Sequence, residues 1–202
     1  MISKEFSLLL FSGGLDSTAV LLWLLKNSKE NIHVHHIFLQ NSENRAEAEK
    51  ISVNKILNYC KLNYDRPFTY TRSVWKMPEE AFVPFDLYVY MFTAAMIARG
   101  YKGRNILKKV VTGSIKENIK TEIRRKQAWG IFKSSCAGRP DLEKVEWFTP
   151  LSEMTKKEVY AYLPKELSEL TWSCRRPIYN NDKILKCGIC VACKELEKIQ
   201  GN

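Results

Sequence analysis

Apolar and polar positions divide the chain into two kinds of segment. Short runs of mainly apolar residues predict buried strands, and longer segments with apolar residues three or four positions apart predict helices. Strands that alternate with helices are typical of parallel βαβ units with helices on both faces of the sheet, so the pattern predicts an α/β fold. The predicted strands span 6–11, 31–40, 66–74, 106–114 and 144–150, and the predicted helices span 16–27, 42–60, 84–100, 116–134, 155–163 and 164–170.

The amino-acid composition changes after Leu170, where cysteine, arginine, proline and asparagine become frequent. Before this point the pattern of strands and helices is continuous, without an internal repeat or a low-complexity linker. We therefore expect an α/β domain over residues 1–170 and a small appendage over residues 171–202. Within the larger domain, Ser42 is the predicted N-terminal cap of the helix over 42–60.

The segment Leu8–Val20, LLLFSGGLDSTAV, contains a glycine-rich turn between a predicted strand and a predicted helix. Gly13 and Gly14 lack side chains, so the backbone can bend tightly there and approach a bulky anion. The first N–H groups of the helix would point at that anion, and the helix dipole favours negative charge. Asp16 suits such a site if a divalent cation links its carboxylate to phosphates. An ordinary strand-to-helix turn is the alternative interpretation.

Several loops with polar or glycine residues follow predicted strands. They span 12–18, 40–45, 113–118 and 149–156. In open parallel sheets, ligands bind beyond the carboxyl ends of the strands, which lie at one edge of the sheet. We therefore expect these loops to contribute to one composite site.

The appendage contains cysteines with the spacing C-x12-C-x2-C-x2-C. Cysteines two residues apart can converge on one ion, and four thiolates form the closed tetrahedral site of structural zinc. We therefore predict a zinc knuckle, with a redox-active C-x-x-C pair as the alternative. Cys60 and Cys136 lie outside this pattern and are predicted to be ordinary thiols. The predicted metal ligands are Cys174, Cys187, Cys190 and Cys193.

The chain carries a formal net charge of +10, and its basic residues gather in 101–109, 115–127 and 173–177. Such clusters are typical of proteins that bind a nucleotide, a tRNA or an acidic protein surface. They are equally typical of a solvated surface that keeps a protein soluble. The charge therefore leaves both interpretations open.

The apolar segments are shorter than the ~18 residues that a membrane span requires. The first predicted strand begins at Phe6, which leaves no room for a signal peptide. We therefore expect a cytoplasmic protein, not bound to a membrane, whose cysteines stay reduced. His33 and His35 share one face of a predicted strand and His36 points to the other, so we interpret them as strand residues and not as metal ligands.

The string SGGLDST over residues 12–18 resembles the PP-loop of the ATP pyrophosphatases. The resemblance implies the adenine-nucleotide α-hydrolase (PP-loop) fold, which is α/β with a Rossmann-like parallel sheet. These enzymes cleave ATP into AMP and pyrophosphate and adenylate a carbonyl or carboxylate oxygen, so that a nucleophile can displace AMP. By this resemblance, the loop binds ATP and Mg²⁺ through Ser12, Gly13, Gly14, Leu15, Asp16, Ser17 and Thr18.

A PP-loop combined with a C-terminal four-cysteine zinc knuckle resembles the 7-cyano-7-deazaguanine (preQ0) synthases of queuosine biosynthesis. The segments VVTGSIKEN and FTPLSEMTKKEV are also similar to segments of that family. The resemblance places Gly113 at the glycine that ends a strand, and it implies that Lys156 contacts ATP, with Asp16 and Lys156 as catalytic residues. The implied enzyme is a C–N ligase that adenylates 7-carboxy-7-deazaguanine, after which ammonia gives an amide and a second activation gives the nitrile.

The chain also departs from the family pattern. In place of Y-G-Q-R-H it has LQNSENRAEAE, where only Arg45 and a downstream acid, Glu47 or Glu49, are comparable. Asp86 stands where the V-P-x-R-N segment has arginine or asparagine. The D-Y-S-G-Y-P-D-C-R substrate segment is absent, and residues 116–129 read KENIKTEIRRKQAW. The nucleotide end is therefore expected to be intact and the substrate end to be remodelled.

The remodelled segment leaves the acceptor of the activated deazaguanine open. One predicted helix face carries apolar residues four positions apart, beside a basic stripe. This helix either packs on the core or docks an acidic protein partner. The two sets are Ile115, Ile119 and Ile123, and Lys116, Lys120 and Arg124.

If a partner docks there, the enzyme would transfer the activated deazaguanine to an amine of that protein, as expected of synthase-like proteins in anti-phage defence operons. A tRNA-modifying PP-loop enzyme is a further alternative, although nucleic acid is the less favoured partner because no separate RNA-binding domain is recognisable. A binding module without catalysis fits poorly with the intact glycine loop and Lys156. The resemblance also leaves a homodimer open.

Overall fold

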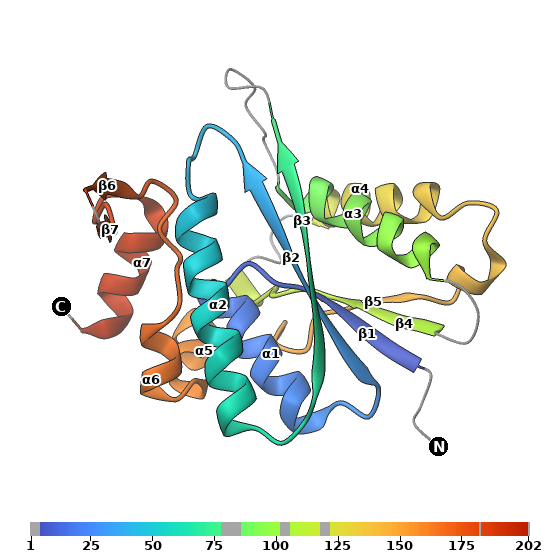
Figure 1. The fold of residues 1–202 in the computed structure, drawn as a ribbon, viewed down its shortest axis with the longest axis horizontal. Coiled ribbons are helices and arrows are strands. Elements are labelled where there is room, and N and C mark those ends of the chain that lie inside the picture. Colours follow the sequence, from blue (N-terminus) through green and yellow to red (C-terminus); the bar gives the residue numbers. More distant parts are fainter. Residues whose placement is uncertain (1–4, 78–85, 102–105, 118–121, 182, 202) are drawn as a thin grey trace.

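The computed structural model describes residues 5–77, 86–101, 106–117, 122–181 and 183–201. A parallel five-stranded sheet lies at the centre of the fold (Figure 1), with the strand order β3-β2-β1-β4-β5. The chain first adds strands on one side of β1 and then, with β4, on the other. This point of reversal is where ligands bind in open α/β sheets. The strands are β1 Glu5–Leu10, β2 Asn31–Gln40, β3 Phe68–Lys76, β4 Ile106–Val111 and β5 Glu146–Phe148.

Helices cover both faces of this sheet, as Figure 1 shows. One face carries α1 Leu15–Asn27, α2 Ala46–Asn63, α5 Lys156–Tyr162 and α6 Lys165–Glu169, and the other carries α3 Asp86–Gly100 and α4 Glu122–Ser135. The short 3-10 turn η2 Pro140–Leu142 precedes β5. The α/β fold with a parallel sheet that the sequence pattern predicts is therefore confirmed.

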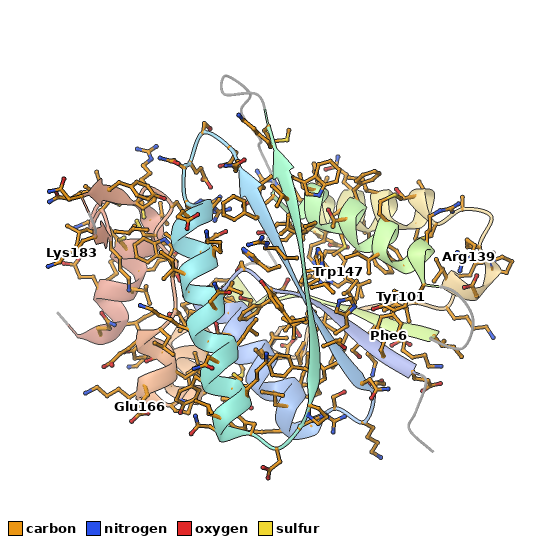
Figure 2. All side chains as sticks on the ribbon, in the orientation of Figure 1. Phe6, Tyr101, Arg139, Trp147, Glu166 and Lys183 are labelled. Carbon is orange, nitrogen blue, oxygen red and sulfur yellow. The ribbon has the colours of Figure 1, made fainter. Side chains whose placement is uncertain are left out.

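Each face of the sheet has its own apolar core because successive residues of a strand point in opposite directions. Leu9 of β1 belongs to the core beneath α1 and α2, and its neighbours Leu8 and Leu10 belong to the core beneath α3 and α4. At the start of the same strand, the ring of Phe6 lies 4.4 Å from the ring of Tyr101 (Figure 2). The alternation fixes β1 between the two helical layers and thereby fixes the loop that follows it.

The histidines of β2 alternate in the same way. His33 Nε2 and His35 Nδ1 lie 2.5 and 2.7 Å from the hydroxyl of Thr71, while His36 Nδ1 donates to the Phe11 carbonyl 2.9 Å away on the opposite face. All of these imidazoles are buried, and they form no metal-ligating cluster within the described residues. Their interpretation as strand residues that alternate between the faces is confirmed.

The start of α2 differs from the prediction. Ser42 does not cap this helix, which begins at Ala46 with Arg45 as its N-cap residue and without a side-chain capping bond. Asn41 instead accepts a hydrogen bond from the Glu43 N–H at 3.0 Å, which is the geometry of an Asx turn. Residues 41–43 are therefore part of a turn and are not available as the first residues of the helix.

The helix predicted over 116–134 is α4, and it is described only from Glu122 onward. Ile115 is buried in the loop that precedes it, whereas Ile123 is 74% exposed. The expectation that these isoleucines share one helix face is therefore wrong. α4 buries Ala128 and Phe132 instead, and Ile119 and Lys120 lie outside the described residues.

The segment after Leu170 has secondary structure that the sequence pattern did not predict. It forms an antiparallel hairpin, β6 Ile178–Asn180 with β7 Lys183–Leu185, followed by helix α7 Val191–Gln200. Figure 1 places this unit beside α2 and α5. Among all helices of the described residues, none has both the length and the apolar character of a membrane span.

Candidate active site

The glycine loop joins the carboxyl end of β1 to the start of α1. Gly13 has a φ of +74°, and a Cβ built on it would lie only 2.9 Å from the side chain of Val53. Gly14 is the N-cap residue of α1 and has no side chain to cap it. The positive end of the helix dipole therefore borders the cavity that Gly14, Leu15 and Asp16 line.

Asp16 and Lys156 meet at this cavity. The Lys156 ammonium donates to both carboxylate oxygens of Asp16 at 2.8 Å each. Burial raises the pKa of Asp16, and the charge of Lys156 opposes this effect. Lys156 is the first residue of α5, whose start is fixed by a capping box between Thr155 and Glu158. Two side chains 140 positions apart are thus held together by two helix N-termini.

The loop after β4 packs tightly against the same turn. A Cβ on Gly113 would lie 2.7 Å from the backbone nitrogen of Ser17 and 2.9 Å from the carbonyl carbon of Asp16. Only glycine fits this approach without moving the backbone of α1. Gly113 therefore brings the end of β4 to the glycine loop at the point where the strand order reverses.

These elements line one cavity of about 560 Å³. Most of the predicted nucleotide-binding residues line it, and we call this part of the lining the first end: Ser12, Gly14, Leu15, Asp16, Ser17, Gly113 and Lys156. Gly13 and Thr18 do not line it. Gly13 is buried against Val53, and Thr18 donates to the Gly14 carbonyl at 2.8 Å, so these two residues shape the loop from behind.

The cavity is also lined by Arg45, Glu49 and Arg175, which we call its second end and which belong to an ion cluster that the sequence pattern did not predict. Arg45 contacts Glu43 at 2.9 Å, Glu49 at 3.2 Å, and Asp86. Arg175 contacts Glu43 at 2.8 Å and Asp86 at 3.6 Å. Burial raises the pKa of Glu49 to about 7, although Arg45 opposes this effect. The loop before α2, α2 itself, α3 and the C-terminal segment therefore bring three carboxylates and two guanidinium groups together, and of these Arg45, Glu49 and Arg175 line the cavity.

The C-terminal segment also supports the glycine loop directly. The Trp172 N–H donates to the Gly13 carbonyl at 2.9 Å, and the Leu15 N–H donates to the Ser173 hydroxyl at 3.5 Å. The Ser52 hydroxyl of α2 donates to the Leu170 carbonyl oxygen and also lies 3.3 Å from the Gly13 carbonyl oxygen. The segment predicted to begin an appendage is therefore part of the wall of the site.

The predicted metal ligands converge. The sulfur atoms of Cys174, Cys187, Cys190 and Cys193 all lie within 4.8 Å of one another, so they could hold a metal ion. The backbone N–H of Cys190 donates to the Cys187 sulfur at 3.3 Å, which lowers the pKa of this thiol to about 6. Cys60 is buried elsewhere, and burial raises the pKa of its thiol to about 12.

The fold resembles that of the U34-tRNA thiolase NcsA from Methanococcus maripaludis with its [4Fe-4S] cluster, with a TM-score of 0.54 and 14% sequence identity. The alignment covers 96% of this chain and 63% of that protein. This likeness concerns the fold.

Curated relatives match over nearly the whole chain. A 7-cyano-7-deazaguanine synthase from Bacillus subtilis is 29% identical over 95% of this chain and 92% of its own length. The synthase from Clostridium acetobutylicum is 29% identical over 96% and 92%, and that from Sulfurihydrogenibium is 25% identical over 98% and 95%. The family model of the queuosine biosynthesis protein QueC matches residues 6–199. With its parallel sheet, glycine loop and four-cysteine cluster, the chain belongs to the QueC family.

Proposed function

We propose that the protein is an ATP-dependent C–N ligase that adenylates 7-carboxy-7-deazaguanine and admits an amine to the activated carboxyl group. The observation that carries this proposal is the Asp16–Lys156 contact beside the glycine loop, within a cavity of about 560 Å³ that extends to a second, differently charged end. Such a cavity has room for a nucleotide phosphate chain at one end and an acceptor at the other.

The reaction needs activation because a carboxylate is a poor electrophile. Its oxygen attacks the α-phosphorus of ATP, pyrophosphate leaves, and the carbonyl carbon gains AMP as a leaving group. Ammonia then displaces AMP to give the amide. A second ATP activates the amide oxygen, and loss of AMP and protons gives the nitrile.

The residues of the first end have roles that follow from their chemistry. Ser12, Ser17 and the α1 N-terminus supply hydrogen-bond donors for phosphate oxygens. Lys156 neutralises charge that develops on the departing pyrophosphate. The Asp16 carboxylate suits a hard, oxygen-ligated cation, and Mg²⁺ bound there would reduce the charge repulsion between phosphates and Asp16.

The cysteine cluster supports a structural zinc ion. Zn–S bonds of about 2.3 Å place the four sulfurs of a tetrahedral site roughly 3.8 Å apart. The Cys174–Cys187 and Cys187–Cys193 sulfur distances of 3.5 and 3.9 Å agree with this value. A cubane cluster would separate the sulfurs further, because four irons stand between them. We therefore assign zinc to Cys174, Cys187, Cys190 and Cys193.

The test measures AMP, pyrophosphate and deazaguanine products by liquid chromatography and mass spectrometry. With ATP, Mg²⁺, ammonium and 7-carboxy-7-deazaguanine, we expect AMP release that depends on the carboxylate, together with the nitrile. Lys156→Ala should slow AMP release by about 100-fold or more, as expected for the loss of a charge that stabilises the transition state. Lys157→Ala, at the exposed neighbouring position, should keep the wild-type rate. AMP release at the wild-type rate in Asp16→Ala would contradict the assignment.

A protein amine is a second acceptor, favoured by the rim of the cavity. Val191 lines the cavity yet is 72% exposed, and the nearby Ile189 is 73% exposed. Together with the absent substrate segment, this apolar rim suits a docked polypeptide better than ammonia alone. Mass spectrometry of a candidate partner after the reaction tests this acceptor. An added deazaguanine mass supports it, and efficient nitrile formation with ammonium and no mass change excludes it.

A further inference from the structure

The two ends of the cavity differ in charge. At the first end Lys156 pairs with Asp16, so these two side-chain charges cancel when both are ionised, and the positive N-terminus of α1 remains to attract phosphates and carboxylates. At the second end, three carboxylates face two guanidinium groups, so the cluster carries one more negative than positive charge when all are ionised. An anionic substrate group is therefore favoured at the first end, and a hydrogen-bond donor at the second.

Within the cluster, Glu49 is the carboxylate placed to meet a ligand. Its side chain is only 5% exposed and lines the cavity, whereas Glu43 and Asp86 are not among the lining residues that the described part of the chain contributes. Arg45 and Arg175 both contact Glu43 and Asp86, but the ion pair found for Glu49 is with Arg45 alone. Burial outweighs this single ion pair in its effect on the Glu49 pKa. Added N–H donors would therefore stabilise the charged carboxylate.

We infer that Glu49 recognises the guanine-type edge of the substrate, accepting hydrogen bonds from the ring N1–H and the 2-amino group. This inference rests on the proposed function. The two donors are neighbours on the six-membered ring, and a carboxylate accepts such a pair in a bidentate manner. The substrate carboxylate sits on the five-membered ring, away from that edge. One molecule can therefore place its base edge at Glu49 and its carboxylate toward ATP.

Other parts of the cavity lining suit a flat heterocycle. Tyr90 of α3 and Trp172 of the C-terminal segment line the cavity together with Leu87. Aromatic and aliphatic surfaces favour burial of a ring whose polar atoms are satisfied at its edge. Arg45 is a positioning residue in this arrangement, because it holds the Glu49 carboxylate through Oε1 without itself being the recognised group.

The experiment compares substrate binding in wild type, Glu49→Gln and the matched control Glu47→Gln, by calorimetry with 7-carboxy-7-deazaguanine and separately with ATP. Glu47 lies on the same helix, pairs with Lys50, and its side chain is 44% exposed. Glu49→Gln should bind the deazaguanine about 10- to 100-fold more weakly, because the hydrogen bonds to a charged acceptor are lost. It should bind ATP as wild type does, since Arg45 keeps its ion pairs with Glu43 and Asp86. Glu47→Gln should match wild type for both ligands.

The affinity ratio between the substrate and an analogue without the 2-amino group distinguishes recognition from a structural role. If Glu49 were only structural, its substitution would not change this ratio. Wild type should prefer the substrate over this 7-carboxy-7-deazahypoxanthine by at least about tenfold, and Glu49→Gln should lose most of that preference. Melting temperature and metal content check that the variant is folded.

Equal deazaguanine affinity in wild type and folded Glu49→Gln would overturn the inference while leaving the proposed function intact. The same holds if the preference for the 2-amino group survives in the variant, or if only the ammonium dependence of the rate changes, since that outcome marks a general base. A wild-type protein that binds ATP but not 7-carboxy-7-deazaguanine would instead overturn the proposed function itself.

Discussion

At the scale of single residues, His35 links stability to pH. Burial lowers its pKa from 6.5 to about 4, and the neighbouring His33 and His36 add to this effect. In the unfolded chain His35 therefore binds a proton below pH 6.5, whereas in the folded chain its imidazole stays neutral until about pH 4. Because the unfolded state binds more protons in this window, the free energy of unfolding falls as the pH falls.

We predict that His35→Asn flattens this dependence. An amide side chain can still contact the hydroxyls of Thr71 and Ser73, which lie 2.7 and 3.0 Å from the imidazole. Between pH 7 and pH 5, wild type should lose roughly 2 kcal/mol more than the variant in urea unfolding. Glu49 acts in the opposite direction, since its raised pKa stabilises the protonated folded state, but it does so equally in both proteins. Parallel pH profiles for the two proteins would contradict the prediction.

Individual site residues could be predicted where all members of a motif lie within one short segment of the sequence. The SGGLDST string and the cysteine spacing each lie within one short segment. The ion cluster was not predictable in this way, although Arg45, Glu49 and Asp86 could each be singled out. It joins α2, α3 and Arg175 of the C-terminal segment, and only tertiary packing brings these elements together.

At the scale of elements, the start of α5 determines where Lys156 lies. Thr155 caps the helix by accepting from the Glu158 N–H at 3.3 Å, and the Glu158 carboxylate accepts from the Thr155 N–H at 2.7 Å. Thr155→Ala should lower the free energy of unfolding by about 1 kcal/mol. It should also slow AMP release, because the residue after the cap loses its fixed position.

Glu158→Gln is the control, since glutamine preserves a capping box. It should retain stability and rate close to wild type. Denaturant titration and the AMP assay test both variants, and a Thr155→Ala protein with unchanged activity would show that the cap does not position Lys156.

Elements also show where sequence patterns mislead. The pattern of apolar residues predicted a helix over 155–163, and the structure begins α5 at Lys156 with a capping box between Thr155 and Glu158. The four-residue spacing of Ile115, Ile119 and Ile123 misled, because such spacing defines a face only if one continuous helix contains all of these residues. Ile115 lies in a loop and its side chain is buried there, so its burial does not show which face of α4 packs on the core.

At the scale of the whole molecule, the cysteine cluster and the glycine loop form one unit. The chain from Trp172 to Cys174 connects the Gly13 carbonyl to the first predicted zinc ligand. Cys190→Ser should lower zinc below half an equivalent per chain and increase protease sensitivity, because metal binding supplies folding energy. AMP release should also fall by roughly five- to tenfold, as expected when one or two hydrogen bonds to the loop are lost.

Cys136→Ala, outside the cluster, is the control and should keep zinc and activity. Metal analysis, limited proteolysis and the AMP assay are made on the same preparations. A Cys190→Ser protein that lacks zinc but releases AMP at the wild-type rate would separate the cluster from the loop.

The hydrogen bond from Trp172 to the Gly13 carbonyl also has a consequence for the timing of synthesis. Trp172 follows Gly13 by about 160 residues. At roughly 5–20 residues per second, the ribosome adds it roughly 10–30 s after the glycine loop. During that interval the glycine loop lacks the hydrogen bond from the Trp172 N–H to the Gly13 carbonyl. A nascent chain therefore completes the support of its glycine loop only when the tail is made. Under the proposed function, ATP turnover by growing chains is delayed until then.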